Sequence, residues 1–177
     1  MFLRNRLVHF FHLDGEIERL KGRLRELETE LSQDENFGIL NRNGLLHFAN
    51  KQPRGITRHL VLIDIDHLHE LNHRYGYEEM NRRIRSMFSI PVQGSDCFVG
   101  KFFSGDEVLC VAGVRREDAE AIVKKLEVSA AENGISFTWV MGVWKTEEDI
   151  AKVALTLAQM NLEKKVAQRR RLAQTGV

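Results

Sequence analysis

The chain has 177 residues, of which 43% are apolar and 29% are charged, and this suits one α/β domain of about 140 residues with an appendage. The formal net charge of +1 gives no electrostatic basis for binding long nucleic acid or an anionic membrane surface. Two cysteines are too few for a disulfide framework, and Cys110 lies in an apolar run that favours a structural thiol, so the composition indicates a cytoplasmic protein.

The N-terminal residues predict a helix and no membrane span. Residues 2–11 are partly apolar, but two arginines interrupt a run that is too short for a spanning helix or a signal peptide. In residues 13–31, apolar side chains recur at alternating spacings of four and three, while charged residues fill the other faces. The recurring residues are Leu13, Ile17, Leu20, Leu24, Leu27 and Leu31. This pattern predicts a parallel two-stranded coiled coil, hence a homodimer; the alternative is one amphipathic helix lying on its own domain.

A domain boundary is expected where this periodicity ends. Residues 32–38 carry cap and turn residues in place of the apolar repeat. We therefore divide the chain into an N-terminal helix or coiled coil, residues 1–33, and a second domain, residues 34–177. No internal repeat or low-complexity tract is visible in either part.

The second domain is expected to alternate helices and strands. Helices are predicted over residues 44–50, 77–88, 116–131 and 147–171, strands over 59–65 and 135–143, and a hairpin over 99–103 and 107–112. The pattern predicts an α+β fold with a palm-like, antiparallel-containing central sheet and flanking helices.

Acidic residues occur at two predicted strand ends. Asp64 and Asp66 end a strand that is otherwise apolar, and they point to one face because they are two residues apart. Asp106 and Glu107 are adjacent on the predicted hairpin turn, where consecutive side chains can reach one solvent-facing site. Carboxylates grouped in this way indicate a site for a divalent metal ion.

Three motifs give the chain a resemblance to a known family. Residues 34–42, DENFGILNR, resemble the motif DxLTGLxNR that opens GGDEF domains, often directly after a coiled coil. Residues 62–77, LIDIDHLHELNHRYGY, look like the segment DIDHFKxINDxYGH of that family, and residues 103–108, FSGDEV, are similar to its signature hairpin. The motifs keep their order and spacing across residues 34–144, so the chain is identified as similar to the diguanylate cyclases, with the divergent signature SGDEV. A palm polymerase of the CRISPR-associated type shares the acidic hairpin, but the opening motif and Asn72 favour the GGDEF family.

The resemblance implies a fold, an activity and a metal site. GGDEF domains have a nucleotidyl-cyclase-like fold, and two subunits, each holding one GTP, join the nucleotides into cyclic di-GMP. By carry-over, Mg²⁺ or Mn²⁺ would be held by Asp64, Asp106 and the carbonyl of Ile65, and Glu107 would support the metal site and the attacking 3′-hydroxyl. The partners implied are GTP or another nucleoside triphosphate and a second copy of the chain.

The same resemblance implies the residues that bind the nucleotide. Asn72 and Asn81 occupy the guanine-binding positions. The backbone of His67, Leu68 and His69 would wrap the phosphates, because unpaired N–H groups are left where a strand turns into a helix. Gly105 would let the hairpin backbone approach the substrate closely.

Several residues depart from the family pattern. His69 replaces a lysine that contacts phosphate, and Asn81 replaces an aspartate that accepts from guanine, so triphosphate affinity should fall and adenine becomes an alternative base. Residues 93–98 lack the RxxD motif, so product feedback is not expected. In the last helix, the phosphate-binding lysine could be Lys164 or Lys165, or both could belong to a solvated helix end with residues 169–171.

Two functions remain open. The first is an enzyme, a diguanylate cyclase-like nucleotidyltransferase that makes a cyclic dinucleotide from GTP or a related triphosphate. The second is a degenerate GGDEF domain that binds nucleotide, or dimerises, as a regulatory module without catalysis. No sensor domain is recognisable, so either residues 2–11 contact an unseen signalling partner, or the chain is a fragment or component of a larger assembly.

Overall fold

A computed structural model of the chain describes residues 15–24, 27, 31–89, 97–103 and 105–175; for residues 172–175 it describes the backbone alone. Residues 15–24 are helical, and the apolar side chains of this segment that are described, such as Ile17 and Leu24, are exposed. The remaining heptad position, Leu13, lies outside the described residues. In the part of the chain that the structure describes, no helix is both long and apolar enough to cross a membrane.

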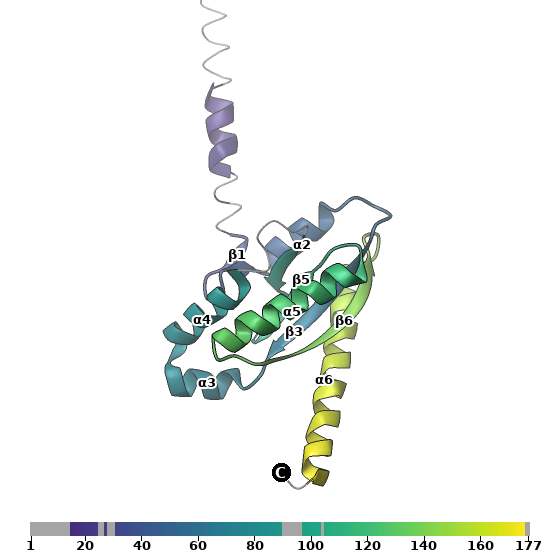
Figure 1. The fold of residues 1–177 in the computed structure, drawn as a ribbon. Helices are drawn as coiled ribbons and strands as arrows, with labels where there is room; N and C mark the ends of the chain where they lie inside the picture. Colours follow the sequence, from purple (N-terminus) through teal and green to yellow (C-terminus); the bar gives the residue numbers. More distant parts are fainter. Residues whose placement is uncertain (1–14, 25–26, 28–30, 90–96, 104, 176–177) are drawn as a thin grey trace, which may run out of the picture.

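Six strands form one mixed sheet in the order β1-β2-β4-β5-β3-β6 (Figure 1). The strands are β1 (Gln33–Asp34), β2 (Ile39–Leu40), β3 (Thr57–Ile65), β4 (Phe98–Lys101), β5 (Glu107–Val111) and β6 (Phe137–Lys145). Among the strands of the described residues, only β2 and β4 pair in parallel; every other neighbouring pair is antiparallel. The expected α+β fold with an antiparallel-containing sheet is therefore confirmed.

Helices cover both faces of this sheet. They are α2 (Arg42–Asn50), α3 (Leu68–Tyr75), α4 (Tyr77–Ser89), α5 (Arg116–Glu132) and α6 (Ile150–Thr175). In Figure 1, α5 crosses in front of the strands, while α6 lies behind them and continues past the sheet towards the C-terminus. The resulting arrangement has a helix layer, a sheet and a second helix layer.

Side chains along β3 alternate between the two faces of the sheet, so β3 contributes to a separate hydrophobic core on each face. Val61, Ile63 and Ile65 pack with apolar residues of α4 and α5 on one face. Leu60 and Leu62 pack with residues of α2 and α6 on the other. All five side chains are fully buried, because β3 lies inside the sheet with a helix layer on each side.

Some helices and strands begin at other residues than predicted, because hydrogen bonds at their ends set the boundaries. The strand expected over residues 135–143 starts at Phe137, because Ile135 still donates from its backbone N–H to the Ala130 carbonyl at the end of α5. The last helix starts at Ile150 instead of residue 147, where Asp149 Oδ1 accepts a hydrogen bond from the N–H of Ala151. The short strands β1 and β2 were not predicted.

The two cysteines lie in the core, as expected for Cys110. Their sulfur atoms are 3.3 Å apart, and both residues are buried. The hydrogen bond with Cys97 and the burial of the thiol raise the pKa of Cys110. Cys110 is therefore a protonated, structural thiol.

Candidate active site

The acidic residues converge because of the register between β3 and β5. Asp64 pairs with Glu107 across the two strands, so their side chains lie on one face at neighbouring positions. Asp106 immediately precedes β5, and its carbonyl accepts a hydrogen bond from the N–H of Ile65 at 3.3 Å. The hairpin and the end of β3 are thus tied together, which brings the three predicted carboxylates to one place.

Burial and mutual repulsion raise the pKa of two of these carboxylates, Asp64 and Glu107. Burial raises the pKa of Asp64, and the charges of Asp106 and Asp66 raise it further, although Lys165 opposes this. Burial likewise raises the pKa of Glu107, with additional contributions from Asp64 and Asp106. Burial and mutual repulsion of the carboxylates therefore outweigh the compensation by Lys165, a condition that a bound cation would relieve.

Two polar residues of α6 contact the acidic cluster. Lys165 Nζ lies 2.7 Å from Asp64 Oδ1 and 3.4 Å from Asp66 Oδ1. Asn161, which is 1% exposed, donates from Nδ2 to Asp64 Oδ2 at 3.3 Å. The Oδ1 atom of Asn161 is buried without a hydrogen-bond partner among the described residues. The last helix thus contributes a cation and a fixed amide to the site.

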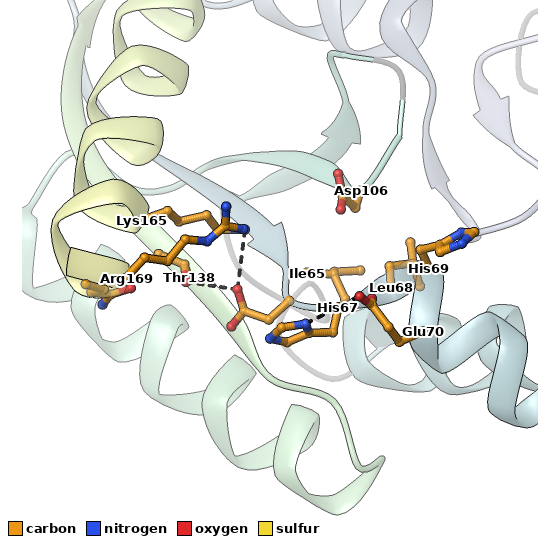
Figure 2. Close-up of a pocket in the computed structure, with 11 residues that line it drawn as sticks. Ile65, His67, Leu68, His69, Glu70, Asp106, Thr138, Lys165 and Arg169 are labelled. Atoms are coloured by element: carbon orange, nitrogen blue, oxygen red, sulfur yellow. Dashed lines mark hydrogen bonds and ion pairs between the residues drawn. The ribbon is translucent and has the colours of Figure 1, made fainter. Parts of the chain in front are cut away.

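The two neighbouring lysines, Lys164 and Lys165, make different contacts. Lys164 Nζ donates to the carbonyl of Trp139 at 2.7 Å and lies over the Trp139 ring, while Lys165 faces the acids. Arg169, one turn beyond Lys165, lines the same pocket (Figure 2). The sequence alone leaves Lys164 and Lys165 as alternatives and allows Arg169 to belong to a solvated helix end. The spacing of four residues between Lys165 and Arg169 was the available signal, because it places both on one helix face.

A pocket of about 470 Å³ lies between the acids and α6. Its lining includes Ile65, Asp66, His67 and Asp106 from the sheet side, and Lys165 and Arg169 from the helix. Figure 2 shows Asp106 approaching from the hairpin and His67 at the start of α3. His67 adopts a left-handed backbone conformation, with φ of 56°, where the chain leaves β3 and enters α3. Such a turn presents backbone N–H groups, so the pocket combines them with two cationic side chains, a combination suited to phosphate.

A second pocket, of about 540 Å³, adjoins the first and contains the predicted base-binding residues. The two pockets share Leu68, His69 and Asp106. Asn72, Asn81 and Gly105 line only the second one. Gly105 has φ of +100°, a conformation that favours glycine, so the hairpin turn depends on that residue.

The two asparagines of the second pocket differ in their contacts. Asn72 Oδ1 is buried without a hydrogen-bond partner among the described residues. Asn81 Nδ2 donates to Asn36 Oδ1 at 3.2 Å, which leaves its own oxygen to accept from a ligand. An orphaned buried oxygen is costly, so the pocket favours a ligand that brings hydrogen-bond donors.

The residues at the acidic cluster fit Mg²⁺ or Mn²⁺ by their chemistry. Asp64 and Asp106 supply carboxylate oxygens, and the strand end supplies the carbonyl of Ile65; these are the hard donors that such ions prefer. Within the described ranges, no three His, Cys, Asp or Glu side chains already converge as a ligand set, and Lys165 contacts Asp64 directly. The fit therefore rests on donor type and on the raised pKa values of Asp64 and Glu107.

A Glu107→Gln variant should be more stable than the wild type at neutral pH. With a raised folded-state pKa, the folded chain binds more protons than the unfolded chain between the usual value of 4.5 and the raised one. The stability contributed by Glu107 therefore falls as pH rises through that window, and the penalty is complete above it. Urea unfolding should show an advantage for the variant at neutral pH that shrinks as pH is lowered towards 4.5.

Glu120→Gln is the matched control for this measurement. Glu120 pairs with Arg116 on α5, and its side chain is 46% exposed, so its replacement should change stability little. A Glu107→Gln variant that is less stable than the wild type at neutral pH would contradict the assignment of Glu107 as a half-buried carboxylate repelled by its acidic neighbours.

The sheet order, the acidic hairpin and the two adjoining pockets define the class of the protein as a nucleotidyl-cyclase-like α+β domain. Comparison with solved structures specifies the fold further, and it is that of GGDEF domains. A microbial GGDEF domain studied with cyclic di-GMP matches with a TM-score of 0.67 and 18% identity, over 80% of this chain and 94% of that chain. No family model and no curated protein matches the sequence.

Two further structures from Pseudomonas aeruginosa extend the comparison. Diguanylate cyclase SiaD, in complex with its activator SiaC, matches with a TM-score of 0.66 and 21% identity, over 92% of this chain and 69% of that chain. The GGDEF domain of FimX matches with a TM-score of 0.55 and 17% identity, over 75% of this chain and 92% of that chain. Because the sequence identities are low, these similarities establish the fold alone.

Proposed function

We propose that the chain is a diguanylate cyclase-like nucleotidyltransferase that condenses two GTP, or related triphosphates, into a cyclic dinucleotide such as cyclic di-GMP. The convergence of Asp64, Asp106 and Glu107 at the end of β3, beside a pocket that Asp106 and Lys165 line, carries this proposal. Carboxylates beside a cationic, N–H-rich pocket provide what phosphoryl transfer requires, namely metal ligands and charge stabilisation. Bound Mg²⁺ would supply neutralisation of the triphosphate charge.

The residues present have distinct roles in this reaction. The 3′-oxygen of one nucleotide forms a bond to the α-phosphorus of the other, the bond to the β-phosphate breaks, and pyrophosphate leaves. Glu107, with its raised pKa, is suited to accept the hydroxyl proton. Lys165 and Arg169 would hold the triphosphate, and Asn72 and Asn81 would bind the base.

A homodimer is part of the proposal, since each subunit would hold one nucleotide. Five exposed apolar side chains of the N-terminal segment keep the heptad spacing: Ile17, Leu20, Leu24, Leu27 and Leu31. Pairing with a second copy would bury them. The SiaD match spans 92% of the chain, a share that residues 34–177 cannot supply alone, so it includes part of this segment. A signalling partner that acts through the segment is a further part of the proposal.

Product analysis tests this function. The full chain is incubated with GTP, ATP or both, with Mg²⁺ or Mn²⁺, at several protein concentrations, and products are identified by mass spectrometry. A cyclic dinucleotide is expected, with a rate per chain that rises with concentration because two half-sites must meet. Absence of any cyclic product at high protein concentration would contradict catalysis.

A second candidate function is a degenerate GGDEF domain that serves as a nucleotide-binding or dimerising module. The contact between Asn81 and Asn36 favours it, because a base-recognition residue is engaged within the protein. His69, which replaces a permanent cation, weakens triphosphate binding in the same direction. Calorimetric titration with GTP separates the candidates, since binding without turnover supports the module.

An Asn81→Asp variant should shift base preference towards guanine by about tenfold or more relative to adenine. A carboxylate accepts from two guanine donors, whereas an amide offers one acceptor and one donor. Affinities for GTP and ATP are compared by calorimetry. Asn50→Asp, which adds the same charge at the end of α2, is the control. Unchanged selectivity in the Asn81 variant would remove Asn81 from base recognition.

A further inference from the structure

Helix α3 carries two histidines in contact on one face. His69 and His73 are four residues apart, so they lie one above the other on the helix. Their ring centroids are 5.0 Å apart with the planes at 83°, and both residues are exposed. The proposed cyclase chemistry assigns no role to His73, and it leaves His69 as a weak substitute for a lysine.

We propose that His69 and His73 form a binding site for a divalent transition-metal ion such as Zn²⁺, Ni²⁺ or Cu²⁺. Zinc–nitrogen bonds are about 2.0–2.1 Å and a ring centroid lies about 1 Å beyond its nitrogen, so two imidazoles on one tetrahedral ion keep their centroids about 5 Å apart. The observed separation of 5.0 Å already matches this requirement. Imidazole nitrogens select these ions over Mg²⁺, so the site is chemically distinct from the carboxylate cluster.

The protein supplies two of the ligands. Among the described residues, no third His, Cys, Asp or Glu completes a set of three, so water or phosphate oxygens fill the other positions. Glu70 follows His69 in a His-Glu-x-x-His pattern, but its Oε1 lies 3.9 Å from Nδ1 of His67. With two protein ligands, the site is of the exchangeable kind, in contrast to a closed structural zinc site or a peptidase centre.

The position of the pair gives a bound ion a local effect. His69 lines both pockets, whereas the family pattern has a lysine at that position and an aspartate at the position of His73. An ion on the pair would place positive charge where the lysine charge is missing. This consequence rests on the proposed function, while the metal site itself does not.

Calorimetric titration of the full, untagged chain with Ni²⁺ or Zn²⁺ in the presence of excess Mg²⁺ tests the site without nucleotide. We expect one ion per histidine pair, at least about tenfold weaker binding in His69→Gln or His73→Gln, and loss in the double variant. The control is His9→Gln/His12→Gln, which removes another pair of closely spaced histidines and should leave this ion bound. Undiminished binding by the His69/His73 double variant, or no binding by the wild type, would overturn the proposal.

A second measurement needs no variant. Zn²⁺ should protect His69 and His73 from carbethoxylation by diethylpyrocarbonate, read residue by residue by mass spectrometry. Exposed His47 should be modified equally with and without the ion. Equal modification of all three histidines in both conditions would also overturn the site. Because neither experiment contains nucleotide, failure here is distinguishable from failure of the cyclase proposal.

Discussion

An Asp106→Asn variant is expected to lose at least about a hundredfold of the rate of cyclic dinucleotide formation while keeping the fold. Asp106 lines both pockets, and its charge contributes to the raised pKa values of Asp64 and Glu107. The amide keeps the size of the side chain but removes the charge that would hold a divalent ion. The substitution should therefore lower both the turnover rate and the part of the nucleotide affinity that depends on the metal ion.

Initial rates by mass spectrometry, together with calorimetric titration of GTP with and without Mg²⁺, measure this effect. Asp118→Asn is the matched control, because Asp118 pairs with Arg115 at the start of α5, apart from both pockets. It should retain turnover. A fully active Asp106→Asn variant would show that the hairpin acid does not serve catalysis, and circular dichroism verifies that both variants are folded.

The second large effect is expected on stability. Trp144→Ala should lower the free energy of unfolding by about 3–5 kcal/mol. Trp144 is 2% exposed on β6 and packs in the core layer that also contains Ile150, Ala154 and Leu157 of α6. Its Nε1 donates to the Glu148 carbonyl at 2.9 Å, just before α6 begins. The residue therefore anchors the helix that brings Lys165 to the acidic cluster.

Urea unfolding followed by far-ultraviolet circular dichroism measures this change. Trp144→Phe separates packing from hydrogen bonding, since it keeps an aromatic ring and removes the donor; we expect a loss of about 1–2 kcal/mol for it. A loss below about 1 kcal/mol for Trp144→Ala would mean that the layer under α6 collapses around the missing ring.

The acidic part of the site could be predicted from sequence because its signals are local. Asp64 interrupts an otherwise apolar strand, and Asp106 and Glu107 follow a glycine whose φ of +100° the turn requires. Strand alternation and turn chemistry depend on neighbouring residues only. The convergence of β3 and β5 then follows from the register of one antiparallel pair.

The contribution of α6 to the site could not be predicted from local sequence signals, because the helix has apolar residues on more than one face. Ile150, Ala154 and Leu157 are buried, and the same face continues to Asn161 and Lys165. A competing set is exposed by 37–58%: Leu155, Met160, Leu162 and Val166. Hydrophobic periodicity alone does not say which stripe meets the sheet, so it does not say which lysine faces the acids.

The sequence by itself determined most of the helices and strands, the acidic hairpin and the resemblance to GGDEF domains, since these depend on short-range patterns and on spacing along the chain. Only the tertiary structure decided that Lys165 rather than Lys164 contacts Asp64, that Asn36 holds Asn81, and that the rings of His69 and His73 meet. These contacts depend on the rotation of helices about their own axes and on side-chain orientation. Packing against distant residues fixes both.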